Sequence, residues 1–151
     1  MTKFLLDRML GQTTKWLRLM GVDAEYAPEV EDDELLRIAR SEERILITRD
    51  KELAKSKGVF LVPKATPEKI IHILLKEFDV DIEPMTRCSK CNSIVESVDK
   101  ETVKDSIPEG VLERCNEYWR CIGCGQIYWK GTHWEYIMAT INNILNSVKE
   151  P

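Results

Sequence analysis

Two Cys-x-x-Cys pairs, Cys88/Cys91 and Cys121/Cys124, are the residues of this chain with the clearest chemistry. Each pair places two thiolates close enough together to share one metal ion. Two such pairs complete the tetrahedral shell that Zn²⁺ prefers. We therefore expect a structural zinc site that holds residues 86–130 together.

Two disulfides, or a thioredoxin-like redox pair, are the alternatives to a zinc site. The N-terminal sequence M-T-K-F-L-L-D meets a charge after three apolar residues, so it does not resemble a secretory signal. We expect a reducing, cytoplasmic location, where paired cysteines more often bind metal than form disulfides. Redox chemistry needs only one pair. Because 29 residues separate the two pairs, the intervening loop should carry structure of its own.

Acidic residues form the second group of candidates. Asp7 and Asp50 each follow an apolar stretch that is typical of a strand, and Asp32, followed by Asp33, begins a predicted helix. The carboxyl ends of parallel strands share one edge of the sheet, where ligands bind. Clustered carboxylates repel one another unless a cation neutralises them, and Mg²⁺ or Mn²⁺ suits oxygen ligands. Such a metal can polarise a phosphodiester and activate water for its hydrolysis.

Simpler roles remain open for each of these residues. Asp32 and Asp50 can act as helix N-caps, and Asp7 can pair with a neighbouring basic side chain. Arg8 and Arg49 lie next to the acids, where their planar donors can hold substrate phosphates or balance charge. Taken together, two strand-end aspartates and an acidic helix start favour a metal site.

The elements that must position the acids alternate between short strands and helices over residues 1–83. Strands are expected at Lys3–Leu6, Ala24–Ala27, Arg44–Thr48 and Val59–Val62, and helices after Gly11, from an N-cap at Asp32, over Lys51–Lys57 and from Pro67. Strands that are separated by single helices form a parallel sheet covered on both faces. We therefore expect an α/β domain over residues 1–83.

Residues 84–151 are expected to form a second unit. Asp79–Arg87 is predicted to be a linker, because Pro84 interrupts it and the helical period is lost. The cysteine module follows, and after Gly131 comes a final helix whose apolar stripe can pack on either unit.

Aromatic residues crowd around the second cysteine pair: Tyr118, Trp119, Tyr128, Trp129 and Trp134. Exposed aromatic faces can stack on unpaired bases. A metal module this small also needs an apolar core, and we expect most of these rings to serve in it.

Composition excludes some classes of function. The net charge of −4 provides no overall basic field, which argues against a simple high-affinity nucleic-acid coat protein. It leaves open an enzyme that reaches phosphates through a divalent metal. No apolar run approaches membrane-spanning length, so we expect no membrane partner.

The chain resembles the PIN-like ribonucleases, in particular the family named for the Mut-seven C-terminal RNase domain. The matching stretches are F-L-L-D-R-M-L-G (Phe4–Gly11), K-W-L-R-L-M-G-V-D (Lys15–Asp23), D-D-E-L-L-R-I-A (Asp32–Ala39), R-I-L-I-T-R-D (Arg44–Asp50) and the ribbon sequence that ends at Trp134. The resemblance implies a PIN-like three-layer α/β/α domain with a parallel sheet, then a small zinc-ribbon module with structural Zn²⁺ and a C-terminal helix. It also implies Mg²⁺- or Mn²⁺-dependent cleavage of RNA, expected to be single-stranded.

The resemblance assigns the acidic metal ligands to Asp7, the Asp32/Asp33 pair and Asp50. PIN nucleases usually present a fourth acid on a later strand-to-helix turn, and here only Glu68 is available. We expect a metal-dependent ribonuclease in which Asp7, Asp32 and Asp50 hold the cation. Asp33 then supports them and the two arginines contact phosphate. The alternative is a non-catalytic RNA- or protein-binding adaptor in RNA processing or ribosome assembly. Protein partners and oligomeric state are left open.

Overall fold

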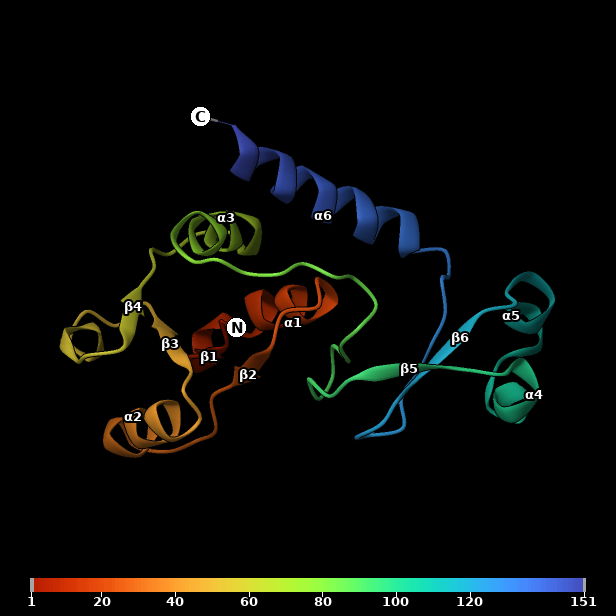
Figure 1. Ribbon diagram of the computed structural model, residues 1–151, viewed down its shortest axis with the longest axis horizontal. Helices are drawn as coiled ribbons and strands as arrows, with labels where there is room; N and C mark the ends of the chain where they lie inside the picture. Colours follow the sequence, from red (N-terminus) through yellow and green to blue (C-terminus); the bar gives the residue numbers. More distant parts are fainter. Residues whose placement is uncertain (1, 151) are drawn as a thin grey trace.

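A parallel sheet with helices on both faces and a separate antiparallel sheet make up the computed structural model, which describes residues 2–150 (Figure 1). The elements up to residue 77 are β1 (Phe4–Leu6), the 3₁₀ helix η1 (Arg8–Leu10), α1 (Gly11–Leu19), β2 (Ala24–Tyr26), α2 (Asp32–Ser41), β3 (Ile45–Thr48), the 3₁₀ helix η2 (Leu53–Lys55), β4 (Val59–Leu61) and α3 (Pro67–Glu77). Those after residue 90 are β5 (Val95–Val98), α4 (Lys100–Val103), the 3₁₀ helix η3 (Lys104–Ser106), α5 (Glu109–Arg114), β6 (Tyr118–Cys121), β7 (Ile127–Tyr128) and α6 (Trp134–Lys149). The predicted α/β fold with a parallel sheet and a C-terminal helix is confirmed.

The parallel sheet has the strand order β2-β1-β3-β4. Successive residues of a strand point to opposite faces. Phe4 and Leu6 therefore enter the core shared with α1 and α3, whereas Leu5 enters the core shared with α2. The result is three layers, with the sheet in the middle.

The final helix, α6, packs on the first unit rather than on the ribbon alone. Ile141 and Ile144 are buried in the same core as Phe4 and Leu17, and α6 crosses α3 (Figure 1). The chain thus leaves the first core after α3, builds the ribbon, and returns through α6. The division at residue 83 stays a prediction, and it separates α6 from the core on which it packs.

Two predicted helices of the first unit needed correction. Glu31, not Asp32, occupies the N-cap position of α2: its backbone is extended, and its carbonyl accepts the first helical hydrogen bond from Leu35 at 3.0 Å. The helix predicted over Lys51–Lys57 is only the short η2, which ends before Gly58 at φ +85°.

The helix α1 ends just before Gly21. Gly21 has φ +84°, and the amides of Gly21 and Val22 donate to the carbonyls of Arg18 and Leu17, each at 2.9 Å. This is the hydrogen-bond pattern that glycine favours after a helix.

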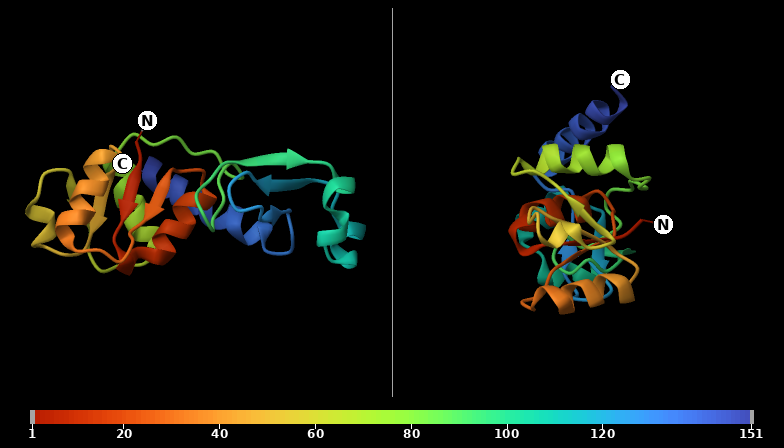
Figure 2. Two further views of the ribbon diagram at one scale, coloured as in Figure 1. Left: turned by 90° about the horizontal axis from the view of Figure 1, so that it is seen from below. Right: turned by 90° about the vertical axis from the view of Figure 1, so that its left-hand side faces the viewer.

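The long loop between the cysteine pairs folds, as expected, into structure of its own. The helices α4 and α5 and the segment between them pack on Tyr118 of β6, in a small core with Val103, Ile107 and Val111. This insertion lies at the end of the ribbon that is farther from the parallel sheet (Figure 2). None of the helices in the described part of the chain is long and apolar enough to cross a membrane.

Candidate metal centre and active site

Four cysteine side chains converge on one point. The sulfur atoms of Cys88, Cys91, Cys121 and Cys124 all lie within 4.8 Å of one another, and all four thiols are free. Four sulfurs around one Zn²⁺ at about 2.3 Å are separated by about 3.8 Å. The Sγ atoms of Cys88 and Cys124 are 3.7 Å apart, and those of Cys91 and Cys121 are 3.3 Å apart. The cluster is positioned to hold a metal ion and could form a zinc ribbon.

The cluster is built from two turns of the same design. The amide of Asn92 donates to the Cys88 carbonyl at 2.9 Å, and that of Gly125 donates to the Cys121 carbonyl at 3.1 Å. Asn92 and Gly125 have φ values of 74° and 79°, so each of the two turns reverses direction at a residue type that tolerates the left-handed conformation. The amide of Gly123 also points at Cys121 Sγ, at 3.3 Å. Such N–H groups stabilise metal-bound thiolates.

Local hydrogen bonds prepare one of the four thiols, that of Cys91, for metal binding. Hydrogen bonds with the side chain and backbone of Ser93 lower the pKa of Cys91 to about 6, which favours the thiolate, the form that binds metal. The Tyr128 hydroxyl lies 2.9 Å from Cys88 Sγ. Cys115 lies outside the cluster, with its Sγ 3.6 Å from the Lys130 carbonyl.

Asn92 joins the first cysteine turn to the edge of the parallel sheet. Its side chain is 3% exposed. Its carbonyl oxygen accepts from the amide of Ala24 at 3.1 Å, and its NH₂ group donates to Asp23 at 2.8 Å and Glu25 at 3.0 Å. Burial acts to raise the pKa of Asp23, but hydrogen bonds from Arg44 and Asn92 outweigh it and leave this pKa lowered.

Arg18 makes a second link across the same junction. It is 7% exposed. Its Nε donates to the Ala24 carbonyl at 2.7 Å, while its Nη1 donates to the carbonyls of Ser89 and Lys90 at 3.3 and 3.2 Å. Arg18 therefore fastens α1 to the first cysteine turn.

Asp7 and Asp50 follow neighbouring strands at the point where the strand order reverses. From β1 the chain proceeds to β2 on one side, and it later returns to β3 on the other side of β1. Ligands of open α/β sheets bind outside the carboxyl ends of the strands at such a switch point. Thr48, at the end of β3, joins the two acids: its hydroxyl donates to Asp7 Oδ2 at 2.7 Å and accepts from the Asp50 amide at 3.0 Å.

The four predicted carboxylates are not drawn into one group. Asp50 Oδ1 accepts from the amides of Glu52 and Leu53, at 2.8 and 3.3 Å, so the capping role considered for Asp50 is present. Asp32 and Asp33 are exposed in the first turn of α2. Within residues 2–150, the cysteine cluster is the only group of three or more such ligands that could hold a metal ion as placed. In the same range, no Lys or Arg forms an ion pair with any of these four aspartates.

Basic side chains lie beside Asp50. Arg49, Lys51 and Lys64 line a surface pocket of about 560 Å³, together with the apolar side chains of Met9 and Leu61. Arg8 is exposed and pairs with Glu29 at 2.6 Å instead of with Asp7. Glu68, the remaining candidate acid, lines a different groove, which α3 forms with α6.

Thr48 is the residue that sequence reasoning missed. It was expected only as the last residue of a strand, yet it is fully buried and contacts both strand-end acids. The one signal in the sequence is a small hydroxyl residue two positions before Asp50, in I-T-R-D.

The fold and the site define an α/β protein with acidic side chains at the switch point of its sheet and a cluster of four cysteines positioned to hold a metal ion. The family model of the Mut7-C RNase domain matches residues 2–141, and the chain belongs to this family. Membership suggests a function of the ribonuclease type. Comparisons with curated proteins and with solved structures gave no match.

Proposed function

We propose that this protein is a ribonuclease that uses Mg²⁺ or Mn²⁺, bound by Asp7, Asp32 and Asp50 with support from Asp33, to hydrolyse single-stranded RNA. The observation that carries the proposal is the placement of Asp7 and Asp50 on either side of the β1/β3 switch point in a member of an RNase family. We propose further that the four cysteines hold a structural Zn²⁺, and that the protein works in the cytoplasm, where thiols stay reduced.

The donor set suits a hard cation. An ionised carboxylate offers about four lone-pair positions. Asp7 uses two of them, one for the Arg8 amide and one for Thr48, and the hydrogen bonds to Asp50 all fall on Oδ1. Oxygen atoms therefore remain available, and no Lys or Arg in the described chain forms an ion pair with these acids. Bound there, Mg²⁺ or Mn²⁺ supplies Lewis-acid stabilisation of the charge that develops on a phosphodiester.

The protein's own groups bind and orient the strand. Arg49, Lys51 and Lys64 line the pocket beside Asp50 and supply phosphate contacts. Arg8 can join them once it exchanges its exposed partner Glu29, because an exposed ion pair contributes little. Thr48 holds the Asp7 carboxylate in place through one hydrogen bond to Oδ2, and the other lone pair of that oxygen stays free.

Cleavage of labelled single-stranded RNA in Mn²⁺ tests the proposal. Asp7→Asn and Asp50→Asn should each lower the rate by about 100-fold or more. Asp50→Asn keeps an oxygen for the two amides that donate to Oδ1, and Asp7→Asn keeps an oxygen for one of the two hydrogen bonds that Asp7 accepts, so folding and cysteine metal content are matched to wild type before rates are compared. Asp105→Asn, on exposed η3 of the ribbon, is the matched control and should cleave normally. Cleavage retained in both site variants would remove the carboxylates from the mechanism.

A non-catalytic RNA-binding adaptor is the second candidate. The capping bonds of Asp50 and the separate positions of the four carboxylates favour it. Salt-dependent RNA binding by a wild-type protein that shows no cleavage in Mn²⁺ or Mg²⁺ would select the adaptor.

A further inference from the structure

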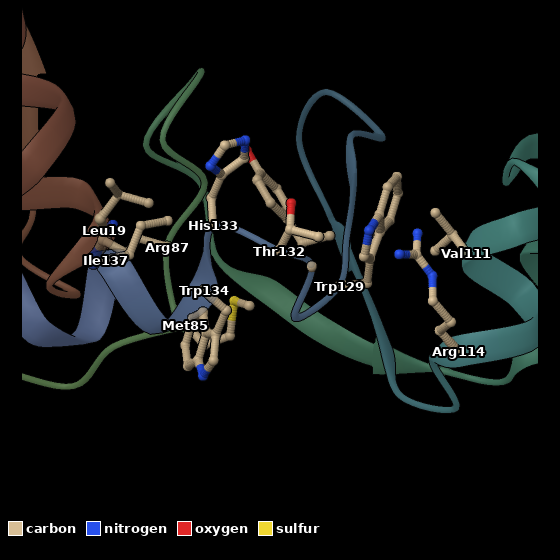
Figure 3. Close-up of a pocket in the computed structure, with 12 residues that line it drawn as sticks. Leu19, Met85, Arg87, Val111, Arg114, Trp129, Thr132, His133, Trp134 and Ile137 are labelled. Atoms are coloured by element: carbon tan, nitrogen blue, oxygen red, sulfur yellow. The ribbon is translucent and has the colours of Figure 1, made fainter.

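A second pocket, of about 390 Å³, lies between the ribbon, α5 and the start of α6 (Figure 3). Its walls include Met85, Arg87, Arg114, Trp129, His133 and Trp134. It shares no residue with the carboxylate site or with the pocket beside Asp50. Figure 3 shows Trp129 beside Arg114 on one side and Trp134 beside Met85 on the other.

The charge of this pocket is opposite to that of the whole protein. The net charge of the chain is −4, yet both charged residues that line the pocket, Arg87 and Arg114, are basic, and no acid lines it. Arg87 is engaged, since its Nη1 donates to the Asn92 carbonyl at 2.8 Å and its Nη2 pairs with the Asp23 carboxylate at 3.7 Å. Arg114 is exposed, and among the described residues only its Nε has a hydrogen-bond partner, donating to the Gly110 carbonyl at 3.0 Å. Its terminal nitrogens can therefore hold an anion, and the fork of a guanidinium fits phosphate.

One aromatic side chain of the pocket wall, Trp134, is not part of an apolar core. Trp129 packs against the small core around Tyr118, at a ring distance of 6.4 Å. Trp134 is half-buried and belongs to none of the apolar cores of the described residues. The Lys130 ammonium lies 5.2 Å from the Trp134 ring centroid, which adds another positive charge next to the pocket. A planar group with an attached anion is the ligand that such walls accept.

We propose that this pocket binds one unpaired nucleotide of the RNA strand, with the base against the Trp134 ring and its phosphate on Arg114. The proposal rests on RNA being the substrate of the proposed ribonuclease. A duplex hides the faces of its bases, so the ligand is a single-stranded segment. The ribbon then anchors the RNA strand at a point separate from the carboxylates. Loss of this pocket weakens RNA binding more than it slows the cleavage step.

Fluorescence anisotropy with a short labelled single-stranded RNA tests this, using the full chain with its metal-loaded ribbon and no Mg²⁺ or Mn²⁺. Stacking on one aromatic ring is worth about 1–3 kcal/mol, so Trp134→Ala should raise Kd by about 5- to 150-fold. Tyr136→Ala is the matched control: Tyr136 lies on the same helix, is 64% exposed and does not line the pocket. It should leave Kd unchanged.

Arg114→Gln provides an independent variant on an exposed position, where folding is not at risk. It should weaken binding and reduce the slope of log K against log salt by about 0.7, the value for one phosphate of a single strand. Arg40→Gln, exposed at the end of α2, is its control and should change neither quantity.

The outcomes separate this inference from the proposed function. Wild-type cleavage together with unchanged RNA affinity in both Trp134→Ala and Arg114→Gln overturns the pocket and leaves the ribonuclease standing. Weakened binding in both variants, with no cleavage by wild type, supports the pocket and overturns the ribonuclease. If the pocket binds an acidic peptide instead, both variants should bind RNA as tightly as wild type, and that result counts against the inference.

Discussion

Thr48 shows how one buried hydroxyl can set the geometry of a site made from distant parts of the sequence. It is the only described side chain that hydrogen-bonds to both strand-end acids, donating to the Asp7 carboxylate and accepting from the Asp50 amide. A hydroxyl can do both at once, which no apolar residue of the same shape can. Thr48 is thus a positioning residue for the proposed cation site.

Thr48→Val should lower RNA cleavage by about 10- to 100-fold, the usual effect of removing a partner of a metal ligand. Thr48→Ser keeps the hydroxyl and should restore most of the rate. Thr14 is a matched control, because it is also buried but donates only to the Leu10 carbonyl. Thr14→Val should alter stability by about 1 kcal/mol and leave cleavage unchanged. Rates should be compared at equal metal content of the ribbon; a fully active Thr48→Val would contradict this role.

For single residues, the sequence predicted which residue types matter better than it predicted their hydrogen-bond partners. Asp7 and Asp50 do follow their strands as expected, because each apolar run ends visibly at charged residues. The cysteine cluster also assembled as expected, since the spacing within each Cys-x-x-Cys pair is local. Thr48 could not be found in this way, because its importance depends on the register of β1 beside β3. The burial of Arg18 against the first cysteine turn depends likewise on how the two units dock.

The elements meet at positions where only particular backbone shapes fit. Gly21 ends α1 at φ +84°, and a Cβ there would lie 2.1 Å from the Glu83 carbonyl oxygen of the linker. The amide of Glu83 in turn donates to the Met20 carbonyl at 2.9 Å. The end of the first helix and the segment leading to the ribbon therefore share one close contact that requires glycine.

Gly21→Ala should destabilise the protein by about 2–5 kcal/mol, because left-handed backbone strain and overpacking add. Gly58→Ala is the control, since Gly58 has nearly the same φ, +85°, and nothing within 4 Å of the added Cβ. It should cost only about 1–2 kcal/mol. Urea unfolding of both variants measures the difference, and equal losses would show that the contact with Glu83 does not matter.

Element types were easier to predict than element ends. Strand and helix order in the first unit followed from apolar periodicity, whereas the start of α2 moved by one residue because Glu31 has the extended backbone of an N-cap. The helices between the cysteine pairs were expected only as unspecified structure, and their core around Tyr118 depends on contacts across the insertion.

The whole molecule is held together by the contacts of its cysteine cluster as well as by its cores. Asn92 and Arg18 tie the first cysteine turn to β2 and α1, so disorder in that turn leaves buried polar groups of the first unit without partners. The ribbon is thus part of the stability of the parallel-sheet unit, and not a pendant module.

Removal of the cysteine-bound metal by a chelator should lower the melting temperature of the entire chain by about 10–20 °C, as expected for a loss of several kcal/mol. Amide exchange should accelerate in α1 and β2 as well as in the ribbon. Cys121→Ser should show the same loss, whereas Cys115→Ser, outside the cluster, should bind one metal ion per chain and melt normally. An unchanged melting temperature after metal removal would contradict the coupling.

The return of α6 to the first core also determines when that core can be completed during translation. About 60 residues separate the end of α3 from the buried turn of α6, which takes about 3–12 s at about 5–20 residues per second. During that interval the apolar surface that awaits Ile141 and Ile144 is uncovered, while the chain is still beside its own messenger RNA. If the protein is a ribonuclease as proposed, the core that supports its active site is completed only after the ribbon has been translated.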